Sequence, residues 1–146
     1  MSIDNLYQDI ILQHYRHPQG KGLSEDFSIE VHHVNPTCGD EITLRTKVTD
    51  NTIDVSYDNS GCSISQASAS MMWELVQGKN VETVLTLEAE FLDLMQSKGQ
   101  GTDDDESLAD AIAFVGVSKF PARVKCALLA WMALKDALLQ NTRSTA

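Results

Sequence analysis

The hydrophobic residues of this chain change their spacing twice along the sequence, which limits the folds that it can adopt. Between residues 27 and 57, apolar and polar residues alternate in three runs, the period of β-strands that bury one face. Asp50 and Asn51 separate the second run from the third and suit a tight turn. The apolar members are Phe27, Ile29 and Val31, then Ile42, Leu44 and Val48 with Thr46, then Ile53, Val55 and Tyr57. We expect a three-stranded antiparallel meander.

Apolar residues recur at helical spacing on both sides of these strands. Four helices are predicted. The first is capped by Ser2 and ends before Pro18, and the second lies between Cys62 and Gly78. The third runs from Val81 to Met95, and the fourth begins at Pro121 and ends near Asn141. The acidic run Asp103 to Glu106 is either a solvated loop or the first turn of a short helix over Leu108 to Ala113. Residues 140–146 are expected to form a frayed tail. The predicted fold class is α+β, with the antiparallel sheet packed against several helices.

Length and charge limit the function classes further. A chain of 146 residues favours a single domain over 1–146. Its formal net charge of -10 argues against nucleic-acid or anionic-membrane partners, because such binding depends on Lys and Arg. No apolar run approaches the roughly 20 residues of a membrane span, and the first residues lack a secretory pattern. We therefore expect a cytoplasmic protein. The cytoplasm keeps thiols reduced, which suits a chain with three cysteines.

The three cysteines and one aspartate form the candidate site. Cys38 and Asp40 are two residues apart, so both side chains of an extended segment could reach one ion. Cys62 is expected where a strand meets a helix, and Cys126 near a helix start beside Arg123 and Lys125, and both settings favour thiolates. Three thiolates and a carboxylate would complete the four donors that zinc prefers, and ferrous iron accepts similar ligands.

The residues alone leave a second interpretation open. Free cysteines are often small buried hydrophobic residues with no ligand role. The spacing from Cys38 to Cys62 and on to Cys126 matches no zinc-finger pattern. The prediction of a shared metal site rests on all three cysteines lying in loops or near helix starts.

Three motifs resemble those of the SufU branch of the IscU/NifU-N iron–sulfur cluster assembly family, in order and over nearly the whole chain. They are Asn35-Pro36-Thr37-Cys38-Gly39-Asp40, Gly61-Cys62-Ser63-Ile64-Ser65 and Lys119-Phe120-Pro121-Ala122-Arg123-Val124-Lys125-Cys126. The resemblance implies an IscU-like fold with zinc bound by Cys38, Asp40, Cys62 and Cys126. It also implies a zinc-dependent sulfurtransferase, in which Cys38 accepts persulfide sulfur from a SufS-like cysteine desulfurase for iron–sulfur cluster biogenesis. Downstream iron–sulfur assembly proteins would be further partners.

Arg123 is the second candidate catalytic residue. Its guanidinium could hold the anionic persulfide or pair with Asp40, and the alternative is a surface cation near a helix N-terminus, where the helix dipole disfavours positive charge.

Two alternatives to the sulfurtransferase remain. The first is a scaffold that assembles a [2Fe–2S] cluster on the same ligands, with iron in place of zinc. Family scaffolds typically have histidine before the third cysteine, where this chain has Lys125, and the insertion around Gly99 to Asp105 also resembles SufU proteins. The second alternative is a purely structural zinc domain.

The histidines are weaker metal candidates. His14 and His17 share a helix face, but with no nearby carboxylate pattern we expect them at surface or interface positions. His32 and His33 are neighbours on a strand, so their side chains should point to opposite faces and cannot act as a pair.

Overall fold

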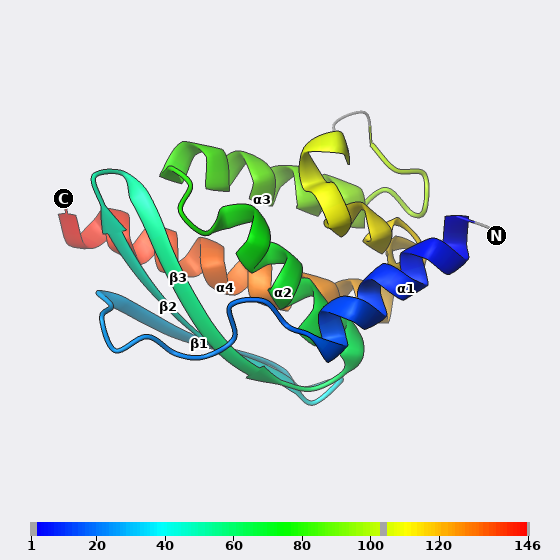
Figure 1. The fold of residues 1–146 in the computed structure, drawn as a ribbon, viewed down its shortest axis with the longest axis horizontal. Helices are drawn as coiled ribbons and strands as arrows, with labels where there is room; N and C mark the ends of the chain where they lie inside the picture. The colour runs from blue at the N-terminus through cyan, green and yellow to red at the C-terminus, as the bar shows by residue number, and fades with distance from the viewer. Residues whose placement is uncertain (1–2, 103–104, 146) are drawn as a thin grey trace.

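The computed structural model describes residues 3–102 and 105–145 and contains one three-stranded sheet with helices against it (Figure 1). Figure 1 shows the β2–β3 turn at one end of the molecule and α1 with η1 at the other. The elements are α1 (Ile3–Arg16), β1 (Ile29–Asn35), β2 (Asp40–Thr49), β3 (Thr52–Ser60), α2 (Ser63–Val76), α3 (Val81–Met95), the 3-10 helices η1 (Asp105–Val115) and η2 (Val117–Lys119), and α4 (Pro121–Thr145).

The sheet is the antiparallel meander that the alternation predicted, in the order β1-β2-β3. On β2, Ile42, Leu44 and Thr46 are buried while the residues between them are at least partly exposed, so one face of the sheet packs on the core. Asp50 and Asn51 form the predicted turn with φ of 51° and 65°. Such left-handed conformations fit the twist of a two-residue hairpin and are tolerated by Asp and Asn.

Helices cover the buried face of this sheet. Helix α4 packs on β1 and β2, α2 packs on β3, and the two helices contact each other. Small residues of α2 allow this close approach, since the buried Ser68 hydroxyl donates to the Ala127 carbonyl at 2.6 Å. Trp131 of α4 stacks on Phe91 of α3, with ring centroids 4.6 Å apart. The α+β prediction is therefore confirmed.

Several boundaries differ from the sequence prediction. Phe27 precedes β1, where its ring lies 4.3 Å from the Arg45 guanidinium carbon, so a cation–π contact replaces strand pairing. The short helix after the acidic run is a 3-10 helix with a kink at Ala109, at φ 48°. Helix α4 continues to Thr145, through most of the predicted frayed tail. Ser2, Asp103, Asp104 and Ala146 lie outside the described residues.

No helix in the described part of the chain is both long enough and apolar enough to span a bilayer.

Candidate metal centre

The turn between β1 and β2 holds the first candidate ligand. Asn35 pairs with Asp40 across the end of the hairpin, which leaves residues 36–39 to close the turn. The Cys38 N–H donates to the Asn35 carbonyl at 3.2 Å, and Gly39 takes a left-handed φ of 70° that favours glycine. Cys38 is half-buried between the exposed Thr37 and Gly39. The thiol therefore lies on a hairpin tip with access to solvent.

Asp40 begins β2 and is fully buried, at 0% exposure. Its Oδ1 accepts a hydrogen bond of 2.8 Å from the Cys62 N–H, and its Oδ2 lies 3.7 Å from Cys62 Sγ. Gly61, at φ 133°, makes room for this carboxylate, because a Cβ there would overlap Oδ1 and lie 2.8 Å from the Asp40 Cα. Cys62 itself is the N-cap residue of α2, in an extended conformation. Asp40 and Cys62 are thus held together at the strand-to-helix junction.

Cys126 approaches the same place from the second turn of α4 and is fully buried. Its Sγ lies 2.9 Å from the Cys38 Sγ, and the Asn35 side-chain amide donates to it at 3.8 Å. The ligand atoms of Cys38, Asp40 and Cys126 all lie within 4.8 Å of one another. Cys62 adjoins this group through its contacts with Asp40. The structure therefore clusters three of the four residues that the sequence predicted as ligands and places the fourth, Cys62, beside Asp40.

The protonation expected for Cys126 is wrong for the metal-free protein. Burial raises the pKa of its thiol, and hydrogen bonds with Cys38 and Asp40 raise it further. Lys125 and Arg123, the cations expected to lower this pKa, are exposed, while Cys126 is fully buried. Burial therefore outweighs the neighbouring charges, because water screens the two cations.

The donor set fits a bound cation. Within the described part of the chain, no lysine, arginine or histidine forms an ion pair with Asp40. A buried carboxylate without a positive partner is costly, and so is a buried thiolate beside it. A metal ion would neutralise both, and sulfur with carboxylate oxygen is a set that zinc accepts.

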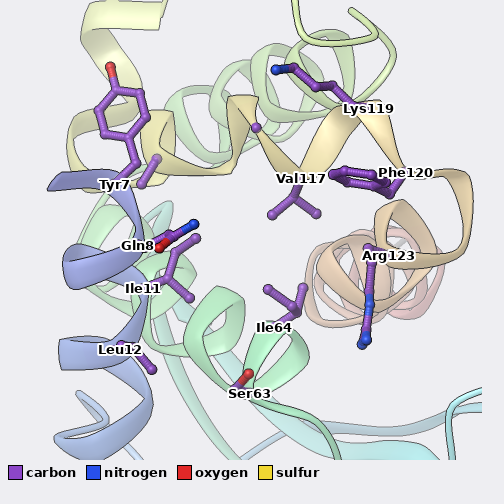
Figure 2. Close-up of a pocket in the computed structure, with 12 residues that line it drawn as sticks. Tyr7, Gln8, Ile11, Leu12, Ser63, Ile64, Val117, Lys119, Phe120 and Arg123 are labelled. Carbon is purple, nitrogen blue, oxygen red and sulfur yellow. The ribbon is translucent and has the colours of Figure 1, made fainter. Parts of the chain in front are cut away.

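Arg123 does not take part in this cluster. Among the described residues, Arg123 forms no ion pair with Asp40. The predicted pairing of these two side chains is therefore not observed. Arg123 lines a groove of about 580 Å³ instead. Figure 2 shows Arg123 on the α4 side of this groove, Ser63 and Ile64 on the α2 side, and Leu12 on α1. Since Ser63 directly follows Cys62, the groove begins beside the candidate ligands.

The histidines divide as follows. His32 is exposed and bonded to Thr43, while His33 contacts Asp136 of α4, so the two point to opposite faces as predicted. His14, expected at a surface or interface, is buried.

A family comparison matches a range that includes the sheet and this cluster. The NifU-like N-terminal domain matches residues 6–139, a range that contains all three cysteines and Asp40. The chain belongs to the NifU-like N-terminal domain family.

Relatives within the NifU-like family carry two different functional names. The chain is 47% identical over 141 residues to the zinc-dependent sulfurtransferase SufU of Bacillus subtilis strain 168, covering 96% of this chain and 94% of that protein. It is 37% identical to the iron–sulfur cluster assembly scaffold protein IscU of Streptococcus pyogenes serotype M1, covering 97% of this chain and 88% of that protein. A crystal structure from Fervidobacterium islandicum AW-1, described as an iron–sulfur cluster assembly scaffold for the SUF system, matches with a TM-score of 0.79 at 31% identity, covering 94% and 99%.

Replacing Asp40 with asparagine should affect the metal-bound and metal-free proteins differently. Asparagine keeps the size of the side chain and can still accept from the Cys62 N–H, but it removes the buried charge. We expect zinc affinity to fall by at least about tenfold, while the free energy of unfolding of the metal-free protein stays within about 1 kcal/mol or rises. Denaturant unfolding with zinc and with a chelator measures both effects. Equal destabilisation of the two forms would contradict a ligand role for Asp40.

Proposed function

We propose that this protein is a zinc-dependent sulfurtransferase that accepts persulfide sulfur from a cysteine desulfurase and supplies it for iron–sulfur cluster assembly. The observation that carries the proposal is the half-exposed Cys38 thiol, on a hairpin tip, in contact with a buried carboxylate and thiol cluster. Such a cluster combines a strong metal site with one thiol that an external donor can reach. The relative named zinc-dependent sulfurtransferase, matched over 96% of the chain, supports the same function.

Cys38, Asp40, Cys62 and Cys126 are the proposed zinc ligands. Bound zinc would favour the thiolate forms of these cysteines and cover their reactive sulfurs. The chain itself prepares the site, because Gly61 leaves room for Asp40 and the α2 N-terminus presents the Cys62 N–H to it. Asn35 contributes a side-chain N–H to the Cys126 sulfur. These contacts hold three of the donors on the ends of regular elements.

Cys38 is the proposed sulfur acceptor. Its thiolate attacks the outer sulfur of the donor's cysteine persulfide; a new S–S bond forms on Cys38, the donor's S–S bond breaks, and the donor cysteine leaves as a thiolate. The transfer needs no external oxidant or reductant. Cys126 is unsuited to the role because it is fully buried in α4. Cys62 is half-buried but held at the α2 N-cap beside Asp40, whereas Cys38 lies on a turn that can move.

The groove beside the cluster is the proposed contact surface for the desulfurase. Phe120 lines it and is 60% exposed, which is unusual for so large an apolar ring. Lys119 and Arg123 add positive charge to it, although the chain as a whole carries a net charge of -10. An apolar groove with basic residues at its edge suits the end of a donor chain that carries an anionic persulfide.

Arg123→Ala tests whether this cation assists the transfer. The Arg123 side chain is exposed and outside the cluster, so we expect unchanged zinc content and a sulfur-acceptance rate lowered roughly tenfold. Lys125→Ala is the matched control, because Lys125 is an exposed cation on the same helix that does not line the groove. Rates are measured as sulfur accepted from a desulfurase supplied with cysteine. If both variants accept sulfur at the wild-type rate, Arg123 has no role in transfer.

The scaffold is the second candidate function, supported by relatives named as scaffolds and by a donor set that also suits iron. Desulfurase turnover separates the two functions. A sulfur acceptor relieves the enzyme of its persulfide, so turnover of a cysteine desulfurase should rise when this protein is added. Unchanged turnover, with iron and acid-labile sulfide on the protein, would favour the scaffold.

A further inference from the structure

A second cluster of ligating side chains lies away from the cysteines, between α1, α2 and η1. His14 of α1 is 6% exposed, and its Nε2 lies 3.1 Å from Oδ2 of Asp110 in η1 and 3.9 Å from Oε1 of Glu74 in α2. These three ligand atoms lie within 4.8 Å of one another. Figure 1 shows α1, α2 and η1 meeting at the end of the molecule opposite the β2–β3 turn.

The other nitrogen of His14 is fixed by Ser70. His14 Nδ1 lies 2.7 Å from the Ser70 Oγ, and that oxygen also accepts from the Gln19 N–H at 2.8 Å. The Ser70 oxygen has two lone pairs, so it can accept from the His14 Nδ1–H as well as from the Gln19 N–H. In that tautomer the ring is fixed at Nδ1, and Nε2 faces the Asp110 and Glu74 carboxylates. A metal-ligating histidine is oriented in this way, because its other ring N–H donates to an oxygen.

We propose that His14, Glu74 and Asp110 form a second site, for a divalent transition-metal ion. The ion binds the Nε2 lone pair while the Nδ1 proton stays in its hydrogen bond to Ser70, and a proton held at Nε2 in the absence of metal passes to solvent. Metal–nitrogen and metal–oxygen bonds of about 2.0 to 2.2 Å separate adjacent ligand atoms by roughly 3 to 3.5 Å. The observed separation of 3.1 Å lies within that range and the one of 3.9 Å lies just above it, so a small movement of Glu74 closes the site.

The donor chemistry distinguishes this site from the cysteine cluster. It offers imidazole and carboxylate without sulfur, which suits Mn²⁺, Fe²⁺ and Zn²⁺. The side chains of Glu74 and Asp110 are 45% and 55% exposed, so water can complete the coordination. His17 and Glu74 line an adjoining pocket of about 190 Å³, which leaves room for that water. We expect weaker binding than at the thiolates, and a bound ion would tie α1 to α2 and η1.

Mn²⁺ is the probe, because it prefers oxygen and nitrogen donors to thiolates. The zinc-loaded protein is titrated with Mn²⁺, and the free ion is followed by electron paramagnetic resonance. Wild type should bind one Mn²⁺ per chain, and His14→Gln should weaken that binding by at least about tenfold. The double variant Glu74→Gln and Asp110→Asn alters only exposed side chains and should lose binding without disturbing the fold. Asp9→Asn, an exposed carboxylate on the same helix, is the matched control.

Binding that disappears in both site variants and persists in Asp9→Asn supports the second site. The proposal is overturned if wild type leaves Mn²⁺ free, or if the double variant binds as well as wild type. In that case His14 serves as a hydrogen-bonded core residue, and His14→Gln would change thermal stability alone. Sulfur acceptance is measured separately, so failure of this site leaves the transferase proposal untouched.

Discussion

Cys38→Ala is expected to reduce sulfur acceptance to background while the protein stays folded. The thiol on this hairpin tip is the proposed attacking group, and no other described cysteine combines its exposure with a position on a turn. Since Cys38 is half-buried and its neighbours are exposed, its loss should change the free energy of unfolding of the metal-free protein by less than about 1 kcal/mol. Peptide mass spectrometry after incubation with a desulfurase and cysteine locates the added sulfur in wild type.

Thr37→Ala is the control for this experiment, because it alters the adjacent exposed position of the same turn and keeps the thiol. It should accept sulfur as wild type does. If Cys38→Ala unfolds, the cluster has a structural role, as in a structural zinc domain. If instead it still carries a persulfide on Cys62 or Cys126, the acceptor is assigned to the wrong cysteine.

Gly61→Ala is expected to have the second largest effect. A Cβ at Gly61 would overlap the Asp40 carboxylate and lie 2.8 Å from its Cα, so both the side chain and the start of β2 must shift. The alanine is also strained at φ 133°. We expect a loss of roughly 2 to 4 kcal/mol in the free energy of unfolding and zinc binding weakened by more than about tenfold.

Gly22→Ala separates strain from the clash. Gly22 has a nearly identical φ of 131°, but nothing lies within 4 Å of a Cβ built there. This variant should show only the backbone strain, roughly 1 to 3 kcal/mol, with unchanged zinc affinity. Denaturant unfolding and competition with a chromogenic zinc chelator measure the two quantities. Equal zinc affinities in the two variants would show that Gly61 does not position Asp40.

The sequence was sufficient to predict the sheet, and the residues that it proposed as ligands lie near one another in the structure. Alternation along β2 is a local signal, because every second residue from Ile42 to Thr46 is buried. The tight turn at Asp50 and Asn51 is also local, since both residues tolerate the left-handed region. The ligand set came from the family resemblance, whereas spacing between Cys38, Cys62 and Cys126 alone had left a structural role open.

Long-range packing explains what the sequence could not predict. The thiol of Cys126 is buried where α4 meets the β1–β2 turn, so burial outweighs its charged neighbours and raises its pKa. The space that Gly61 leaves for Asp40 depends on how β3 and α2 meet β2. His14 has no carboxylate one helical turn away in sequence, yet Glu74 and Asp110 reach it from distant helices. The sequence signal for that cluster was the pair His14 and His17 on one helix face. It did not indicate which carboxylates would lie beside His14.

The central claim is that one site holds zinc and receives sulfur on Cys38. Its most direct test is intact-mass and metal analysis of the anaerobically purified protein, before and after incubation with a cysteine desulfurase and cysteine. The account predicts a single tightly held zinc per chain before incubation, and one added sulfur on Cys38 afterwards. Iron with acid-labile sulfide before incubation, and no sulfur gained on Cys38, would contradict it.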